Sequence, residues 1–238
     1  MDVDFLGPVA SRSTLQDGVY RQLREALMTG SFDPGQVLTI AFLAATFKTS
    51  HMPVREALRR LTAENALVVV ANGSTQVPRV SLAALDDLCL TRVALETLAV
   101  KLAVERSTPE ERKTFLRLLR EHEEAAVERN THKMLQKNQE FHFAIYGACS
   151  SPVLVQFIQT LWLRFGPYMR MLSRHIEPLI VSRKYKPSSH HRDLLAAIDK
   201  GDPRTAAKAV KADIETTQAL LRRLCREAVD EESAAEGR

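Results

Sequence analysis

The spacing of hydrophobic residues in the first part of the chain predicts a helix followed by a turn. Apolar side chains recur every four residues near the start, at Leu15, Val19, Leu23 and Leu27. This period places them on one face of a helix, and Gly30 is a suitable residue to end it. The next stretch, SFDPGQVL, predicts a reverse turn because Pro and Gly favour turn backbone angles. We therefore expect a helix over residues 13–30 and then a turn.

Two further helices and a hairpin are expected before residue 81. The segment TIAFLAATF predicts a short helix capped by Thr39, and SHMPVREALRRLTAEN predicts another helix capped by Ser50. β-branched residues lie on both sides of Asn72-Gly73, a dipeptide that suits a tight hairpin turn. Helices followed by a hairpin in this order form the outline of a winged helix-turn-helix.

From residue 81 onward the pattern predicts helices and no further strand. The expected helices span residues 82–106, 109–129, 132–149, 152–173, 188–200 and 203–227. Gly166-Pro167 should bend or break the fourth of them. We therefore expect a mainly α protein with four parts: a flexible arm (1–12), a winged helix-turn-helix domain (13–80), an all-helical bundle (81–228) and a polar tail (229–238).

Composition narrows the class of protein without identifying a function. Hydrophobic residues make up 45% of the 238 residues and charged residues 26%, as in globular proteins with a core. The net charge of +4 is compatible with binding nucleic acid. The 3 cysteines are widely spaced, which predicts reduced, packed thiols and a cytoplasmic location. The acidic N-terminus does not resemble a signal peptide, and the chain lacks an apolar run of transmembrane length, so we expect no membrane contact.

The helix that begins after Ser50 has the composition of a DNA-recognition helix. Arg55, Arg59 and Arg60 lie on an amphipathic frame whose apolar positions face the core. Arginine can bind guanine bidentately in the major groove, and a helix N-terminus favours a phosphate. We expect the first residues of the helix to point into the groove: Ser50, His51, Met52 and Arg55. A surface helix with solvated arginines is the alternative, and composition alone does not exclude it.

The first domain resembles the DNA-binding domain of the GntR superfamily of bacterial transcription regulators. The similarity is carried by VYRQLREALMTGSFDPGQVL, LAATFKTS and above all PVREALRRLTAENAL. It implies that Arg55 contacts DNA and that Asn72-Gly73 forms the tip of the wing. His51 and Met52 stand where the family usually has Arg and often has Thr, and the wing contains no arginine. We therefore expect a non-standard operator.

The stretch KNQEFHFAI contains a candidate ligand-binding pair. Asn138 and His142 are four residues apart, so on a helix they share a face and can converge on one ligand. The neighbouring Phe141 and Ile145 are also four apart and apolar, which turns this side of the segment inward. Taken alone, a histidine beside an apolar stripe is more often a packed core residue than a metal ligand.

The second domain resembles the FCD effector domain of the FadR-like subfamily. The similarity is carried by TRVALETLAVKLA, NQEFHFAIYGACSSPVL and HHRDLLAAIDKGDPRTAAKAVKADI. It implies a helical bundle that binds a small organic acid, in many members beside a divalent metal held by one Asp and three His. His142 and His191 match two of the family histidines. Asn138 stands at the Asp position and Asp213 at the last His position.

Two interpretations of this altered set remain open. Two histidines and one aspartate can hold zinc, nickel or a similar ion, with the Asn138 oxygen or water completing the shell. Alternatively, the pocket is metal-free, and His142 and His191 bond to Asp213 or to an effector.

The resemblance also points to residues that bind the effector. Arg92 would face the cavity and clamp a carboxylate bidentately, whereas the alternative is a surface ion pair between Arg92 and Glu96, one turn later. Apart from this resemblance, Arg164, Tyr168 and Arg170 flank the Gly166-Pro167 break and are further candidates.

The sequence therefore predicts a ligand-responsive transcription regulator rather than an enzyme. A homodimer would bind the two halves of palindromic operator DNA, and a small carboxylate would alter the position of the DNA-binding domains. The competing hypothesis is a metal-dependent hydrolase with His142, His191 and Asp213 at its site. The chain shows no nucleophile motif or phosphate-binding loop in support of it.

Overall fold

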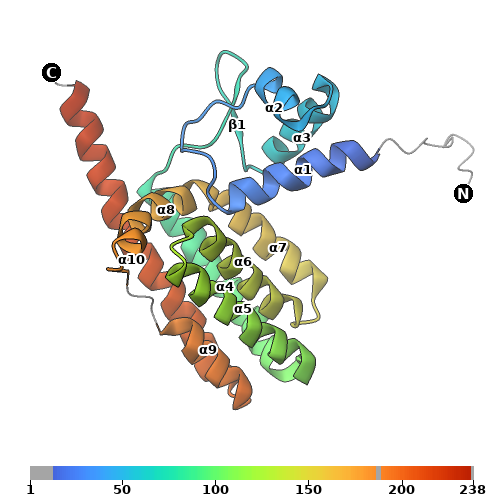
Figure 1. The fold of residues 1–238 in the computed structure, drawn as a ribbon, viewed down its shortest axis with the longest axis vertical. Coiled ribbons are helices and arrows are strands. Elements are labelled where there is room, and N and C mark those ends of the chain that lie inside the picture. The colour runs from blue at the N-terminus through green and yellow to red at the C-terminus, as the bar shows by residue number, and fades with distance from the viewer. Residues whose placement is uncertain (1–12, 186–188, 237–238) are drawn as a thin grey trace, which may run out of the picture.

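The chain folds into a small N-terminal head and a larger helical body (Figure 1). The computed structural model describes residues 13–185 and 189–236, with side chains at 15–185 and 189–227. The predicted arm, residues 1–12, lies outside the described residues. None of the helices in the described part of the chain is both long and apolar enough to cross a membrane.

The head has the predicted winged helix-turn-helix arrangement. Its elements are α1 (Ser13–Met28), α2 (Ile40–Phe47), α3 (His51–Ala63), β1 (Val68–Val69) and β2 (Thr75–Gln76). Thr39 caps α2 as predicted, because its side chain accepts a hydrogen bond from the backbone N–H of Phe42. Ser50 is the N-cap residue of α3, as predicted, although its side chain makes no capping hydrogen bond.

Apolar side chains of α3 bury one face of the helix against the rest of the head. The buried positions are Val54, Ala57, Leu58 and Leu61. Their spacing fits an amphipathic helix whose opposite face is left for solvent or a partner. The strands that follow α3 pair antiparallel, with Val68 opposite Gln76 and Val69 opposite Thr75.

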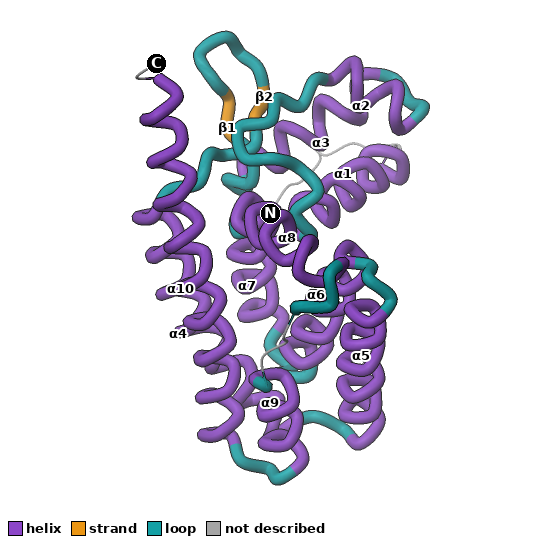
Figure 2. The backbone as a smooth tube through the Cα atoms, turned by 60° about the vertical axis from the view of Figure 1, so that its left-hand side comes forward, coloured by secondary structure: helices purple, strands orange, loops and turns teal. Residues whose placement is uncertain are grey.

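The turn between the strands forms at the predicted dipeptide. Gly73 has a φ of 79°, which glycine adopts without steric cost, and its N–H donates to the carbonyl of Val70. The backbone N–H of Ser74 donates to the side-chain oxygen of Asn72 at 3.0 Å. The hairpin extends beyond the helices of the head (Figure 2).

The body contains only helices among its described residues. They are α4 (Leu82–Arg106), α5 (Pro109–Val127), α6 (Thr131–Gly147), α7 (Pro152–Arg164), α8 (Gly166–Val181), α9 (His190–Asp199) and α10 (Pro203–Glu236). The long helices α4 and α10 lie side by side along the body (Figure 2). Together with α5 to α9 they surround a buried core.

Three boundaries in the body clarify or correct the sequence predictions. The predicted break at Gly166-Pro167 is confirmed, since α7 ends at Arg164 and α8 begins at Gly166. The second half continues to Val181 rather than stopping at 173, although Pro178 lies inside it. Residues 229–236 of the expected polar tail continue α10 as helix. Glycine is absent from α10 and proline occurs only at its first residue, and its end is rich in Ala and Glu, which favour helix.

The head and the body meet where α7 is joined to α8. A Cβ atom at Gly166 would lie 2.3 Å from the carbonyl oxygen of Leu27 in α1, so only glycine fits this contact. Asp33 accepts hydrogen bonds from Arg170 at 2.6 Å and from Arg174 at 2.8 Å. The hydroxyl of Tyr168 donates to the carbonyl of Ser81 at 2.8 Å, at the start of α4. The contacts of Gly166 and Asp33 therefore join the head to the body, and the contact of Tyr168 holds α8 against the start of α4, where the head ends.

Candidate functional site

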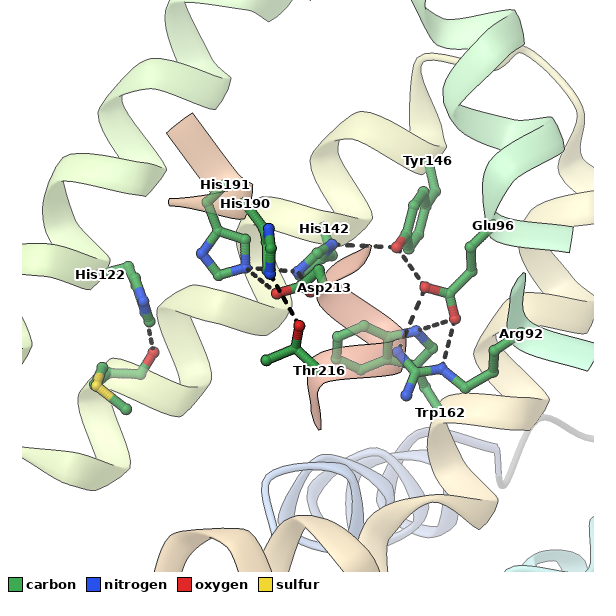
Figure 3. A network of polar contacts seen from close by, with 11 residues as sticks. Arg92, Glu96, His122, His142, Tyr146, Trp162, His190, His191, Asp213 and Thr216 are labelled. Carbon is green, nitrogen blue, oxygen red and sulfur yellow. Dashed lines mark hydrogen bonds and ion pairs between the residues drawn. The ribbon is translucent and has the colours of Figure 1, made fainter. Parts of the chain in front are cut away.

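A cavity of about 220 Å³ lies inside the helical body. Six of the helices around it contribute polar or aromatic side chains: Arg92 from α4, His122 from α5, Asn138 and His142 from α6, Trp162 from α7, His191 from α9 and Asp213 from α10. Most of these residues point toward one another (Figure 3). Residues far apart in the sequence therefore converge on one space.

Three of the four predicted metal ligands come together in this cavity. The Nε2 atoms of His142 and His191 are 3.1 Å apart. The carboxylate of Asp213 lies 3.5 Å from the first of these nitrogens and 3.6 Å from the second. Ligands bound at about 2.1 Å around a tetrahedral ion lie about 3.4 Å from one another. The spacing and chemistry of the three groups therefore fit a divalent metal ion.

Asn138, the fourth predicted ligand, lines the same cavity. It lies one helical turn before His142 on α6. No hydrogen bond joins its side chain to any other residue in the part of the chain that the structure describes. The amide oxygen is therefore available to complete a ligand shell or to contact a bound molecule.

Burial and neighbouring charges set the protonation of these groups. Burial and the neighbouring ring of His191 lower the pKa of His142 to about 3, so its imidazole is neutral at physiological pH. Burial opposes ionisation of Asp213, but electrostatic attraction to His191, and then to His142 and Arg92, holds the pKa of its carboxyl well below the usual range. A neutral imidazole and an ionised carboxylate are the forms that bind metal ions.

Arg92 lines the cavity, as predicted, but its charge is already compensated. Its guanidinium donates to Glu96 at 2.6 and 3.4 Å and lies over the rings of Trp162 and Phe165. The predicted surface pair therefore exists as a buried pair, because Glu96 is completely shielded from solvent. Arg92 forms part of the cavity wall and is not an unpaired clamp for a carboxylate.

Glu96 is the centre of a buried hydrogen-bond network. In addition to Arg92, it accepts hydrogen bonds from the hydroxyl of Tyr146 at 2.5 Å and from the indole N–H of Trp162 at 2.9 Å. The same hydroxyl lies 3.1 Å from Nδ1 of His142. The network thus connects α4 and α7 with the histidine on α6 (Figure 3).

The effector-binding candidates beside the Gly166-Pro167 break lie outside the cavity. Arg164 is exposed at the end of α7 and does not line the cavity. Tyr168 is buried, but its hydroxyl is engaged with Ser81 at the junction of head and body. Arg170, the third candidate beside the break, donates a hydrogen bond to Asp33 of the head. None of the three residues lines the cavity, so the structure does not bring them to the expected effector site.

His122 is a cavity residue that the sequence analysis missed. It is buried, its Nδ1 lies 2.9 Å from the carbonyl oxygen of Met134, and its ring stands at 79° to that of His191. Burial, and then repulsion by His191, lower its pKa. Its spacing from the buried residues Phe115, Leu118 and Leu119 on α5 indicates that it faces the core. This helical spacing is the sequence signal from which His122 could have been predicted as a buried residue.

The predicted DNA-binding residues form a separate exposed surface on the head. The exposed set comprises Ser50, His51, Met52, Arg55, Arg59, Asn72 and Gly73. Arg55, Arg59 and Gly73 line one shallow hollow between α3 and the hairpin. Arg60, in contrast, lies 3.7 Å from the centre of the Tyr20 ring and pairs with Glu64. It therefore contributes to the structure of the head.

Comparisons with known proteins agree with this architecture. Residues 15–77 match the family described as bacterial regulatory proteins, gntR family, and residues 87–216 match the FCD domain. The chain is 36% identical over 165 residues to the HTH-type transcriptional regulator McbR of Escherichia coli K12, covering 69% of this chain and 74% of that protein. It is 33% identical over 163 residues to the Nta operon transcriptional regulator of Aminobacter aminovorans, covering 64% and 77%. The solved structure of E. coli McbR/YncC aligns with a TM-score of 0.79 and 30% identity over 90% of this chain and 99% of that one.

Proposed function

Because this chain belongs to the gntR family of bacterial regulatory proteins and carries an FCD domain, we propose that it is a FadR-like regulator whose body binds a small carboxylate beside a divalent metal ion. Its similarity to McbR and to the Nta operon regulator places it among transcriptional regulators and not among enzymes. The two matched regions support a division of labour, with a DNA-binding head at 13–80 and an effector-binding body at 81–228.

The convergence of His142, His191 and Asp213 is the observation that supports the proposed metal site. Their ligand atoms all lie within 4.8 Å of one another, and both nitrogens and the carboxylate point into one cavity. Zinc and nickel accept this mixture of imidazole and carboxylate ligands. A bound ion would supply two positive charges and open ligand positions for an oxygen ligand.

The charges around the cavity favour a metal if the effector is an acid. Arg92 and Glu96 cancel each other, so Asp213 leaves one negative charge when both imidazoles are neutral. That charge repels a carboxylate from a metal-free cavity. The volume of about 220 Å³ is also smaller than the roughly 300–1,000 Å³ of typical drug-sized sites. Both properties favour a small acid that enters together with a cation.

Metal analysis combined with thermal shift tests this proposal. Protein purified without chelators or a histidine tag should contain zinc or nickel, or take up either ion on titration. Acetate, succinate and citrate should raise the melting temperature only in metal-loaded protein. His142→Ala should abolish metal uptake, whereas His132→Ala, on the exposed face of the same helix, should preserve it.

A metal-free regulator would give a different result. Protein that contains no metal, takes up neither ion and is still stabilised by a small molecule would contradict the metal site while retaining the effector function. Unchanged metal uptake by His142→Ala would contradict the ligand assignment.

The exposed surface of α3 and the hairpin supports operator binding, and we also propose that the protein acts as a homodimer. Apolar side chains are exposed on the adjoining helices α4 and α7, at Leu90, Leu98, Val153 and Phe157. A second copy of the body would shield these side chains from water. Two heads would then engage the two halves of a palindromic operator.

A further inference from the structure

The hydroxyl of Tyr146 lies between two possible hydrogen-bond acceptors. It is 2.5 Å from a carboxylate oxygen of Glu96 and 3.1 Å from Nδ1 of His142. A phenol has a single proton to donate. Tyr146 can therefore donate a hydrogen bond to only one of these two groups. In the other contact, the oxygen of Tyr146 must accept a hydrogen bond from its partner.

The surroundings of Glu96 show that its carboxylate is the group that accepts the hydrogen bond from the Tyr146 hydroxyl. Arg92 and the indole of Trp162, two groups that can only donate, approach its oxygens at 2.6 and 2.9 Å. With Tyr146 as the third donor, the fully buried carboxylate has its charge and its lone pairs satisfied. The phenol keeps its proton, because that proton is shared in the hydrogen bond to this carboxylate.

It follows that the imidazole of His142 donates to the oxygen of Tyr146. The donor must be Nδ1, because this is the nitrogen that faces the phenol. A neutral imidazole carries only one N–H, so the lone pair is left on Nε2. That atom faces Nε2 of His191 and the carboxylate of Asp213 (Figure 3).

We propose that Tyr146 and Glu96 are positioning residues that hold His142 in the tautomer protonated at Nδ1, with its Nε2 lone pair directed at the predicted metal position. The value of this tautomer for metal binding rests on the function proposed above. In the other tautomer, the Nε2–H would donate to Asp213 and occupy the space needed by a cation. Arg92 and Trp162 fix Glu96, so residues on α4 and α7 determine the proton position on α6.

Nitrogen-15 NMR of the imidazole rings tests the tautomer directly in metal-free protein. The wild type should show His142 protonated at Nδ1. Tyr146→Phe removes the acceptor for this proton and should convert His142 to the Nε2-protonated form or to a mixture. Zinc affinity measured by calorimetry should fall by about 10- to 100-fold, the usual effect of removing a residue that orients a metal ligand.

A second substitution, Glu96→Gln, should redirect the hydroxyl proton of Tyr146 while keeping the shape of the side chain at position 96. The amide of Glu96→Gln can donate to the oxygen of Tyr146, which allows the phenol proton to turn toward His142. The tautomer should shift in the same direction as in Tyr146→Phe. Tyr20→Phe is the matched control, because it removes a phenol that donates to Glu64 in the head and should change neither the tautomer nor zinc affinity.

The outcomes separate this proposal from the proposed function. A wild-type His142 protonated at Nε2, or a Tyr146→Phe variant that retains the Nδ1-protonated form, would overturn the positioning role even if zinc binds. The expected tautomer in a wild type that takes up no metal would support the positioning role and contradict the metal site.

Discussion

Arg92 and Glu96 are buried together, with side chains 8% and 0% exposed. Such a pair costs free energy to desolvate, but removing one partner costs more because it leaves the other charge buried alone. Its contribution therefore differs greatly from that of the exposed ion pairs on the body surface. At the residue scale, this pair and its hydrogen bonds define one side of the cavity.

We expect Glu96→Ala to lower the free energy of unfolding by about 3–5 kcal/mol. The loss arises because Arg92 would remain buried without a counter-charge. Glu110→Ala is the control, since its pair with Lys113 is exposed on both sides and should change stability by less than about 1 kcal/mol. Urea unfolding measures both. Similar small losses in the two variants would show that water reaches Arg92.

Arg55 should make the largest single contribution to sequence-specific DNA binding. Its side chain is exposed near the start of α3, where bidentate bonding to guanine is possible. Arg55→Ala should weaken binding to DNA from the protein's own promoter by about 1–3 kcal/mol. Fluorescence anisotropy at fixed salt measures the change. Arg117→Ala, on the exposed surface of α5, should bind as the wild type does; equal losses in both variants would place the DNA surface elsewhere.

Sequence patterns reached some residues of the cavity and missed others. Resemblance predicted His142, His191 and Asp213, which the fold brings together from three helices. The burial of the Arg92–Glu96 pair could not be read from the sequence, because the same spacing also occurs in exposed pairs such as Arg223–Glu227. Here the rings of Trp162 and Phe165 cover Arg92, and both residues are far from the pair in the sequence.

At the scale of elements, the junction between α7 and α8 lies in close backbone contact with α1. Gly166 begins α8 against the backbone of Leu27 in α1. The Gly-Pro dipeptide predicted this break, since proline disfavours a continuous helix. The full extent of α8 was not predictable in the same way. Buried Ile176 and Ile180 lie on both sides of Pro178 and hold the helix together across it.

Gly166→Ala should destabilise the contact between head and body. The added Cβ would lie 2.3 Å from the carbonyl oxygen of Leu27, so one of the two helices has to move. We expect a lower melting temperature and faster proteolysis between the head and the body. Gly147→Ala in α6 meets no atom within 4 Å and should be neutral or stabilising by up to about 1 kcal/mol. Equal behaviour of the two variants would contradict the close contact.

At the scale of the whole molecule, Asp33 joins the head to α8 through Arg170 and Arg174. These pairs link residues about 140 positions apart in the sequence, with separations of 137 and 141. Local periodicity carries no information about such contacts. The arrangement of the two domains therefore lay beyond prediction from sequence patterns, although each domain was predicted separately.

Asp33→Asn should loosen the head while changing stability little. Partly exposed ion pairs contribute at most about 1 kcal/mol each, but these two also fix an orientation. X-ray scattering should show a larger radius of gyration, and high salt should produce the same change in the wild type by screening. Asp17→Asn removes an ion pair within the head and should leave the radius unchanged. An unchanged radius in Asp33→Asn would show that other contacts hold the head in place.

The proposed homodimer makes a separate prediction for the whole molecule. Phe157→Glu would place a charge among the exposed apolar side chains of α7 and should convert the dimer to a monomer. Leu116→Glu, on the exposed face of α5, should remain dimeric. Sedimentation or light scattering distinguishes the states. A dimer that survives Phe157→Glu would place the interface on another face.

The two glycines at the junction also limit how freely domains can be exchanged among related regulators. Gly30 has a φ of 72°, and a Cβ there would lie 2.6 Å from the backbone nitrogen of Arg170, while Gly166 faces Leu27 in the opposite direction. Each domain thus contributes one glycine to a backbone-to-backbone fit. In a chimera that joins this head to the body of another regulator, the two domains will pack in the same way only if that body also has a glycine at the position of Gly166. The compatibility of exchanged domains therefore depends on the absence of a Cβ atom at these two positions.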